Sequence, residues 1–258
     1  MLSFDAKTAR LLDDVYAGSD CTRRRQESFD ALKPAPGEVI LDIGAGNGLL
    51  TGELARAVGP SGRVIAVEPS ADMRASAQAR CAGFDWVEIV DGTADSLPAP
   101  AETIDKAVAV QVFEYLQDIP RAVTEVHRVL RKDGRLVIGD IHFDSLVWHT
   151  DNPDRMARMQ IAWDHHFTTR NVPAQLPAIL RATGFCLDAV TPVTVCDYQL
   201  RPDGLARMMI ILMRDFAIAG GHVPTAEATA WADEQTALAA QGRFFFAVTH
   251  FVTSARKT

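Results

Sequence analysis

Cysteine is scarce in this chain of 258 residues, and its placement excludes the common cysteine-based sites. The four cysteines are Cys21, Cys81, Cys186 and Cys196. Because none of them forms a Cys-x-x-Cys pair, the spacing does not favour a structural zinc site. Scattered free thiols suit a reducing compartment, so we expect a cytoplasmic protein.

Long apolar runs and an excess of positive charge are also missing. No apolar run reaches the length of about 18 residues that a membrane-spanning helix needs. The N-terminus lacks a basic segment followed by an apolar one, so we expect no signal peptide. The formal net charge is −7, and the one basic cluster is Arg23 to Arg25. This acidic balance disfavours nucleic acid or a membrane surface as a partner.

What the chain does have is an ordinary globular composition, with 48% hydrophobic and 23% charged residues. A chain of this length can bury a sizeable core, either as one large domain or as a domain with an added cap.

An apolar run over residues 39–43 enters a loop with Gly44, Gly46 and Gly48. Apolar residues over 49–58 then recur at helical spacing, which predicts a strand, a tight turn and the start of a helix. Glycine lets a ligand approach the backbone without meeting a Cβ atom, and a helix start offers free N–H groups. We therefore expect a nucleotide-like ligand here; the alternative is a glycine turn that binds nothing.

The spacing of these glycines separates several cofactor classes. A dinucleotide fingerprint needs a glycine where this chain has Leu49, and no Gly-Lys-Ser/Thr follows, as a P-loop requires. A β-branched run over 63–67 ends at Glu68, about 20 residues after the loop, where a strand-end carboxylate can bind both hydroxyls of a ribose. The alternative is an exposed glutamate with no ligand.

Strands are also predicted over 86–90, 104–111 and 135–140, with helices between them. This alternation implies right-handed crossovers and a parallel sheet. Ligands bind outside the carboxyl ends of such strands. Five candidate residues lie at these ends: Gly44, Glu68, Thr93, Gln111 and Asp140.

The motif Asp42-x-Gly44-x-Gly46-x-Gly48, together with Glu68 and the loop from Asp91 to Pro98, resembles the class I S-adenosylmethionine-dependent methyltransferases. The resemblance covers about residues 36–140. It implies S-adenosylmethionine as the cofactor. It also implies an α/β fold with a Rossmann-like, seven-stranded, mostly parallel sheet, helices on both faces and an antiparallel last strand. A helical cap would complete this fold.

The resemblance assigns cofactor-binding roles to residues at the strand ends. They are Asp42, Gly44, Ala45, Gly46, Gly48, Glu68, Pro69, Thr93, Ala94, Gln111 and Val112. Thr93 departs from the family pattern, which often has an acid at this place. The backbone N–H of Ala94 can donate to a ring nitrogen whatever its side chain.

We expect residues 1–35 to form an N-terminal helical lid and 36–258 the methyltransferase domain. The substrate cap would come from about 141–180 and 197–241, where methionine and aromatic residues recur at helical spacing. The candidate substrate-binding residues are Tyr16, Phe113, Trp148 and Trp163. The alternative is that these apolar stripes simply pack onto the sheet.

Histidines near the end of the fifth predicted strand are candidates for a general base. His142 and His166 are the predicted catalytic residues, because imidazole can take a proton near neutral pH. A structural histidine is the alternative for each. A metal site is not expected, because the region around His142, His149, His165 and His166 has no His-Glu-x-x-His motif.

The predicted function is methyl transfer to an oxygen, nitrogen or carbon atom of a small molecule, with an apolar or aromatic metabolite favoured. We expect no nucleic-acid or membrane partner, and a monomer or homodimer. Two alternatives stay open: a domain that binds the cofactor without transferring methyl, and a nicotinamide-dependent oxidoreductase. The oxidoreductase is disfavoured by the glycine spacing, and an arsenic methyltransferase by the scattered cysteines.

Overall fold

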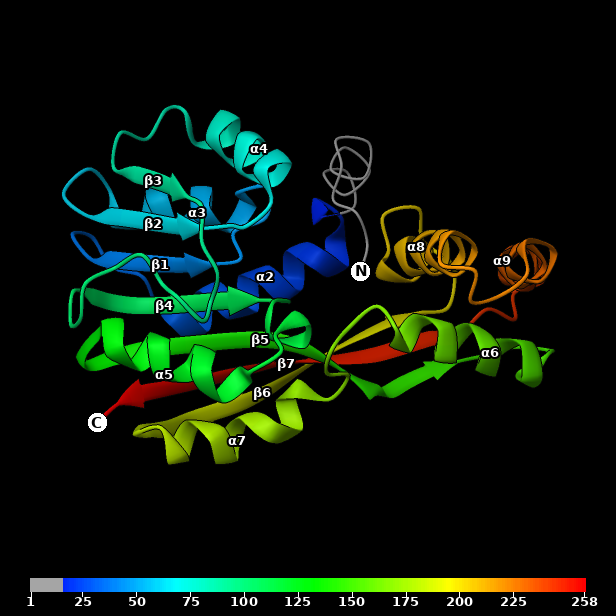
Figure 1. Cartoon of the computed structure of the whole chain (residues 1–258). Helices are drawn as coiled ribbons and strands as arrows, with labels where there is room; N and C mark the ends of the chain where they lie inside the picture. Colours follow the sequence, from blue (N-terminus) through cyan, green and yellow to red (C-terminus); the bar gives the residue numbers. More distant parts are fainter. Residues whose placement is uncertain (1–15) are drawn as a thin grey trace.

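The computed structural model describes residues 16–258, and a seven-stranded sheet in the order β3-β2-β1-β4-β5-β7-β6 lies at its centre (Figure 1). The strands are β1 Val39–Ile43, β2 Arg63–Val67, β3 Val87–Val90, β4 Ile104–Val110, β5 Leu130–Trp148, β6 Phe185–Asp197 and β7 Phe246–Lys257. Strands β1 to β5 pair in parallel, and β7 runs antiparallel between β5 and β6. The predicted sheet, including the antiparallel last strand, is therefore confirmed.

Helices cover both faces of this sheet. They are α2 Ser19–Leu32, α3 Leu49–Val58, α4 Ala71–Cys81, α5 Ile119–Val129, α6 Pro153–Asp164, α7 Val172–Ala182, α8 Leu205–Ala219 and α9 Thr225–Ala240, with the 3-10 turn η1 Phe113–Tyr115 after β4. Neighbouring residues of a strand point to opposite faces. Ile40 accordingly packs with α2 and α3, whereas Leu41 packs with α5 and α7.

Strand β5 is much longer than the predicted 135–140, and this length positions the cap. It continues to Trp148, pairing with β7 as far as Phe246, with an irregular register between His142 and Val147. Figure 1 shows α6, α8 and α9 beside this extension, away from the parallel strands. Their apolar side chains form one buried cluster, in which Trp231 is fully enclosed.

Helix α7 lies within the predicted cap range but packs on the sheet beside α5. Its buried side chains Val172, Leu176 and Leu180 follow helical spacing and join the cluster under α5. The structural cap therefore consists of α6, α8 and α9. Residues 1–15 of the predicted lid lie outside the described residues, and α2 is the part that the structure describes. Within residues 16–258, no helix is both long and apolar enough to cross a bilayer.

Candidate active site

A cavity of about 670 Å³ lies where the parallel strands end and continues under the cap. Its "glycine-loop end" is formed by residues 43–47, 67–70 and 92–94, which follow β1, β2 and β3. Its "cap end" is formed by apolar side chains of β5, of α6 and the loop after it, and of α8, namely Ile141, Phe143, Trp163, Phe167, Leu205, Met208, Met209 and Leu212. The two ends meet at the end of β4 and just after it, where residues 110–112 and 114–116 line the cavity together with side chains of α2.

The three loop glycines have different roles, although all have positive φ angles of 69°, 55° and 80°. Gly44 lies against the side chain of Val112, so a Cβ there would clash. Gly46 lines the cavity, and a Cβ on it would meet no protein atom within 4 Å. Gly48 begins α3, and a Cβ on it would come within 2.9 Å of Ala77 in α4. Gly46 therefore leaves room for a ligand, whereas Gly48 allows two helices to approach.

Glu68 is held at the cavity by the backbone. Its Oε2 accepts a hydrogen bond from Gly46 N–H and its Oε1 one from Ser70 N–H, both at 2.9 Å. The residue is only 8% exposed and lines the cavity beside Pro69. Each carboxylate oxygen has a second lone pair. The side chain is therefore suited to accept hydrogen bonds from the two hydroxyls of a ribose.

Asp42 lies at the same end in a more enclosed place. The hydroxyl of Thr51 donates to its Oδ2 at 2.6 Å. Burial raises the pKa of Asp42 to about 7, and the hydrogen bond from Thr51 only partly offsets this effect. In the loop from Asp91 to Pro98, Thr93 donates to Asp95 at 2.6 Å, and the buried Ala94 lines the cavity.

A buried cation lies where the two ends meet. Arg24 of α2 is 3% exposed and donates to Oε1 of Gln111 at 2.5 Å. Gln111 has a φ of 56°, a conformation that is uncommon for a residue with a side chain and clusters at functional sites. Arg24, Gln111 and Val112 all line the cavity. The guanidinium gives this end of the site a positive charge that a ligand carboxylate can pair with.

Next to it lies a buried acid in contact with the cap through two aromatic groups. Glu114 is 2% exposed, and burial raises its pKa to about 7, an effect partly offset by Tyr115, Arg24 and Gln111. The Tyr115 hydroxyl lies 3.1 Å from Nε2 of His166. Burial lowers the pKa of His166 to about 4, so this imidazole is neutral at pH 7. His166 in turn stacks on Trp163 with ring centres 4.3 Å apart.

The other predicted catalytic histidine has a different position. Ile141 and Phe143 line the cavity, and His142 between them points to the opposite face of β5, as strand alternation requires. Its ring lies 6.1 Å from that of Phe251, and its Nδ1 is 3.9 Å from Asp144. The sequence misplaced this side chain because the strand was expected to end at Asp140.

The predicted substrate residues divide in the same way. Tyr16 and Trp163 line the cavity, and burial raises the pKa of the Tyr16 hydroxyl. Phe113 is fully buried in the cluster under α5. Trp148 packs against Trp231 and Phe246 inside the cap. Phe113 and Trp148 thus serve as packing residues outside the cavity.

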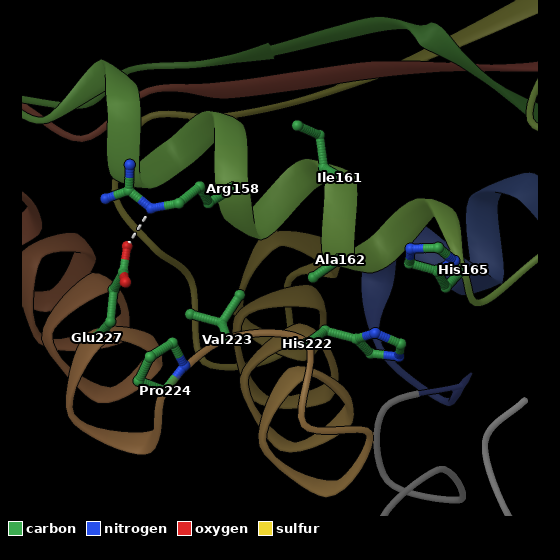
Figure 2. A pocket seen from close by; sticks show the side chains of 8 residues that line it. All are labelled: Arg158, Ile161, Ala162, His165, His222, Val223, Pro224 and Glu227. Carbon is green, nitrogen blue, oxygen red and sulfur yellow. Dashed lines mark hydrogen bonds and ion pairs between the residues drawn. The ribbon is translucent and has the colours of Figure 1, made fainter.

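A second, smaller pocket of about 160 Å³ lies between α6 and the turn that joins α8 to α9 (Figure 2). Arg158 and Glu227 form an ion pair across it, and the rings of His165 and His222 stack 4.7 Å apart at 8°. A metal ion binds in the plane of an imidazole ring, so two parallel stacked rings are poorly placed to share one. Among residues 16–258, no group of three or more His, Cys, Asp or Glu could hold a metal.

Three important cavity residues were not predicted as site residues from the sequence. Arg24 belongs to the basic cluster from Arg23 to Arg25, and Glu114 and Tyr115 follow the predicted strand over 104–111. The available signal was an acid in the otherwise apolar stretch from Val112 to Leu116. A charged residue in such a stretch is either exposed to solvent or buried beside a partner. The sequence alone does not distinguish these two cases, because burial depends on the fold.

The fold and the cavity define a doubly wound α/β protein with a cofactor site at the carboxyl ends of its strands. Residues 41–138 match the family model of the methyltransferase domain. The chain belongs to the class I S-adenosylmethionine-dependent methyltransferases, and S-adenosylmethionine is its cofactor. The residues at the glycine-loop end fit that cofactor, because Glu68 and Gly46 offer a carboxylate and an open backbone to its nucleoside.

The chain is similar in sequence to two proteins named here and in fold to a third. An uncharacterized 37.1 kDa protein in transposon TN4556 of Streptomyces fradiae is 35% identical over 253 residues, which cover 95% of this chain and 70% of that protein. The ubiquinone/menaquinone biosynthesis C-methyltransferase UbiE of Hahella chejuensis is 30% identical over 52% of this chain and 56% of its own length. The crystal structure of the YcgJ protein from Bacillus subtilis has a TM-score of 0.63 at 18% identity, covering 92% of this chain and 98% of that one.

Proposed function

We propose that this protein transfers the methyl group of S-adenosylmethionine to a small molecule with an apolar or aromatic body. The observation that carries this proposal is a single cavity that joins the glycine-loop end to the cap end. A cofactor bound at Glu68 leaves the apolar cap end for a second molecule. Small-molecule sites of this kind are concave and mostly apolar, with a few polar groups that fix orientation.

Each part of the cofactor has a chemically suitable partner at the glycine-loop end and at the junction. Glu68 would accept hydrogen bonds from the ribose hydroxyls, and the backbone of Ala94 would bind the adenine. Arg24, held by Gln111, would pair with the carboxylate of the methionine part. We also propose Asp42, Gly44, Ala45, Pro69 and Thr93 as cofactor-side residues, because they line the glycine-loop end, whereas Gly48 lies outside the cavity lining.

The cap end supports an acceptor of limited size and low polarity. Phe143, Trp163, Met208 and Leu212 offer apolar contacts from three separate elements. Methionine side chains adapt to irregular shapes, so this wall suits a ring system or a branched apolar body. The net charge of −7 argues against a nucleic-acid acceptor. We propose a cytoplasmic enzyme that acts as a monomer or homodimer.

The chain's own contribution to the reaction would be positioning and exclusion of water. The cofactor, when bound, supplies an activated methyl group on a positively charged sulfur. The cap helices would keep the acceptor aligned with this group in a dry cavity, which lowers the barrier by fixing the reacting atoms in place. His166 would act near the acceptor, because it is the predicted catalytic histidine that lines the cavity.

The test uses S-adenosylmethionine carrying a ¹³C-labelled methyl group, incubated with the protein and a small-molecule extract. Mass spectrometry should reveal a labelled apolar product that is missing when Glu68→Ala replaces the wild type. Binding of S-adenosylhomocysteine without any labelled product would contradict methyl transfer. That result would instead favour a domain that binds the cofactor for another purpose.

A further inference from the structure

Glu114 is an acid in an unusual place, because it is buried and also lines the cavity. It is 2% exposed, and within the described residues its Oε2 has no hydrogen-bond partner. It belongs to η1, directly after the strand end at Gln111. At the junction of the two cavity ends, the free oxygen of this acid is available to interact with a ligand group that lies between the cofactor and the acceptor.

The neighbours of Glu114 connect it to both ends of the cavity. Towards the glycine-loop end, it interacts with Gln111, which accepts a hydrogen bond from Arg24. Towards the cap end, it interacts with Tyr115, whose hydroxyl lies 3.1 Å from Nε2 of His166. If His166 donates to the Tyr115 hydroxyl and this hydroxyl donates to the acid, one oxygen is held in place and Oε2 stays free.

Among Glu114 and the groups next to it, Glu114 is the one whose charge changes near neutral pH. Burial raises its pKa to about 7. Asp42, whose pKa is also raised to about 7, lines the glycine-loop end of the cavity instead. Burial and the charge of Glu114 raise the pKa of Asp140 in β5 well above its usual value, and backbone hydrogen bonds from residues 112–114 only partly offset this. Burial and the charge of Glu114 also raise the pKa of Tyr115, while His166 stays neutral with a pKa of about 4. Arg24 is the neighbouring cation.

We propose that Glu114 accepts the proton that a hydroxyl-bearing acceptor loses during methyl transfer, and that Tyr115 and His166 position its carboxylate. This inference rests on the proposed function. The acceptor O–H bond breaks and its proton passes to Oε2 of Glu114. The oxygen's electron pair forms the new bond to the methyl carbon, and the sulfur keeps the electron pair of the broken carbon–sulfur bond. The acceptor class is therefore a hydroxyl group on an apolar or aromatic body.

The experiment compares proton release when S-adenosylmethionine or S-adenosylhomocysteine binds, measured by calorimetry in buffers of different ionisation enthalpy. The two ligands differ only in the methyl group and the positive charge on sulfur, and a nearby cation favours an ionised carboxylate. At pH 7 the wild type should release about half a proton more with S-adenosylmethionine. The difference should vanish at pH 9, where Glu114 is already ionised.

Two variants assign this difference to one residue. Glu114→Gln should abolish it, whereas Asp140→Asn should keep it, because Asp140 is fully buried and does not line the cavity. Tyr115→Phe removes a group that lowers the pKa of Glu114, so the pH dependence of proton release should move to higher pH. A purely structural role of Tyr115 would not move it.

Each contrary result has a distinct meaning. Equal proton release for the two ligands in the wild type, or a difference that persists in Glu114→Gln, would overturn the assignment. Loss of the difference in Asp140→Asn alone would also overturn it. If neither ligand binds, the proposed function fails first. If both bind with equal proton release and labelled methyl is still transferred, only the role of Glu114 fails.

Discussion

The glycine-loop end of the cavity is built from backbone turns, whereas the cap end is built from side chains on separate elements. Gly46 and Glu68 belong to loops directly after β1 and β2, and a hydrogen bond joins them. Phe143, Trp163 and Leu212 come from β5, α6 and α8, which are far apart in the sequence. A site made of turns is specific for one cofactor, while a site made of side chains can change its ligand by substitution.

Gly46→Val should have the largest effect and should act on cofactor binding alone. Its φ of 55° disfavours a β-branched residue, and the added side chain would point into the cavity. We expect the affinity for S-adenosylhomocysteine to fall by about 100-fold or more, equivalent to about 3 kcal/mol. Gly59→Val is a matched control, because Gly59 also has a positive φ and open space but lies outside the cavity. Loss of binding in both variants would mean that strain, and not the blocked site, is the cause.

Glu114→Gln tests the junction between the two ends through stability. The raised pKa means that the folded state holds its proton up to about pH 7, whereas the unfolded state loses it near the ordinary value of about 4.5. Proton binding to Glu114 therefore stabilises the folded state fully below the unfolded-state pKa of about 4.5. This contribution to the free energy of unfolding is lost as the pH rises through the folded-state pKa of about 7. The free energy of unfolding of the glutamine variant, relative to that of the wild type, should therefore be about 2 to 3 kcal/mol higher at pH 8 than at pH 4. Denaturant titrations at both pH values measure this, and a constant difference would show that Glu114 is not protonated in the fold.

Glu68→Ala should weaken the binding of S-adenosylhomocysteine without changing the cap. A lost hydrogen bond to a buried polar group costs about 1 to 3 kcal/mol, so the dissociation constant should rise by about 5- to 150-fold. Calorimetry measures the change, with Glu88→Ala as a control on the exposed side of β3. Unchanged affinity would remove Glu68 from the ribose.

Met208→Ala should have the smallest effect, and it should weaken acceptor binding at the cap end without changing cofactor binding at the glycine-loop end. Met208 lines the cavity but is only half-buried, so its loss should leave the fold intact. We expect the KM for the labelled acceptor to rise by about 3- to 10-fold, for a loss of about 1 kcal/mol of apolar contact. The affinity for S-adenosylhomocysteine should stay the same. An equal effect on both ligands would break the division into two ends.

The same division explains what could be predicted from the sequence. The parallel sheet could be predicted from local patterns, because apolar runs, turns and glycines act over a few residues. The antiparallel last strand was implied by the family resemblance. Gly46, Glu68 and Gln111 reach the cavity because strand ends of a parallel sheet meet at one edge.

The cap end could not be predicted in the same way. His142 was expected in the site because β5 was expected to end at Asp140, but pairing with β7 extends the strand and turns the side chain away. Helix α7 was assigned to the cap although its apolar face packs beside α5. The position of Glu114 depends on distant segments, because Arg24 of α2 interacts with its carboxyl group and the backbone N–H groups of Thr168 and Thr169 donate to its carbonyl oxygen.

The most direct test of the two-ended cavity is a crystal structure of the protein with S-adenosylhomocysteine bound. The ribose should lie on the carboxylate of Glu68, the methionine part beside Arg24 and Gln111, and the sulfur should face Glu114. The space between Phe143, Trp163 and Met208 should remain free for an acceptor. A ribose away from Glu68, or a ligand that fills the cap end, would contradict the division of the cavity into a cofactor side and an acceptor side.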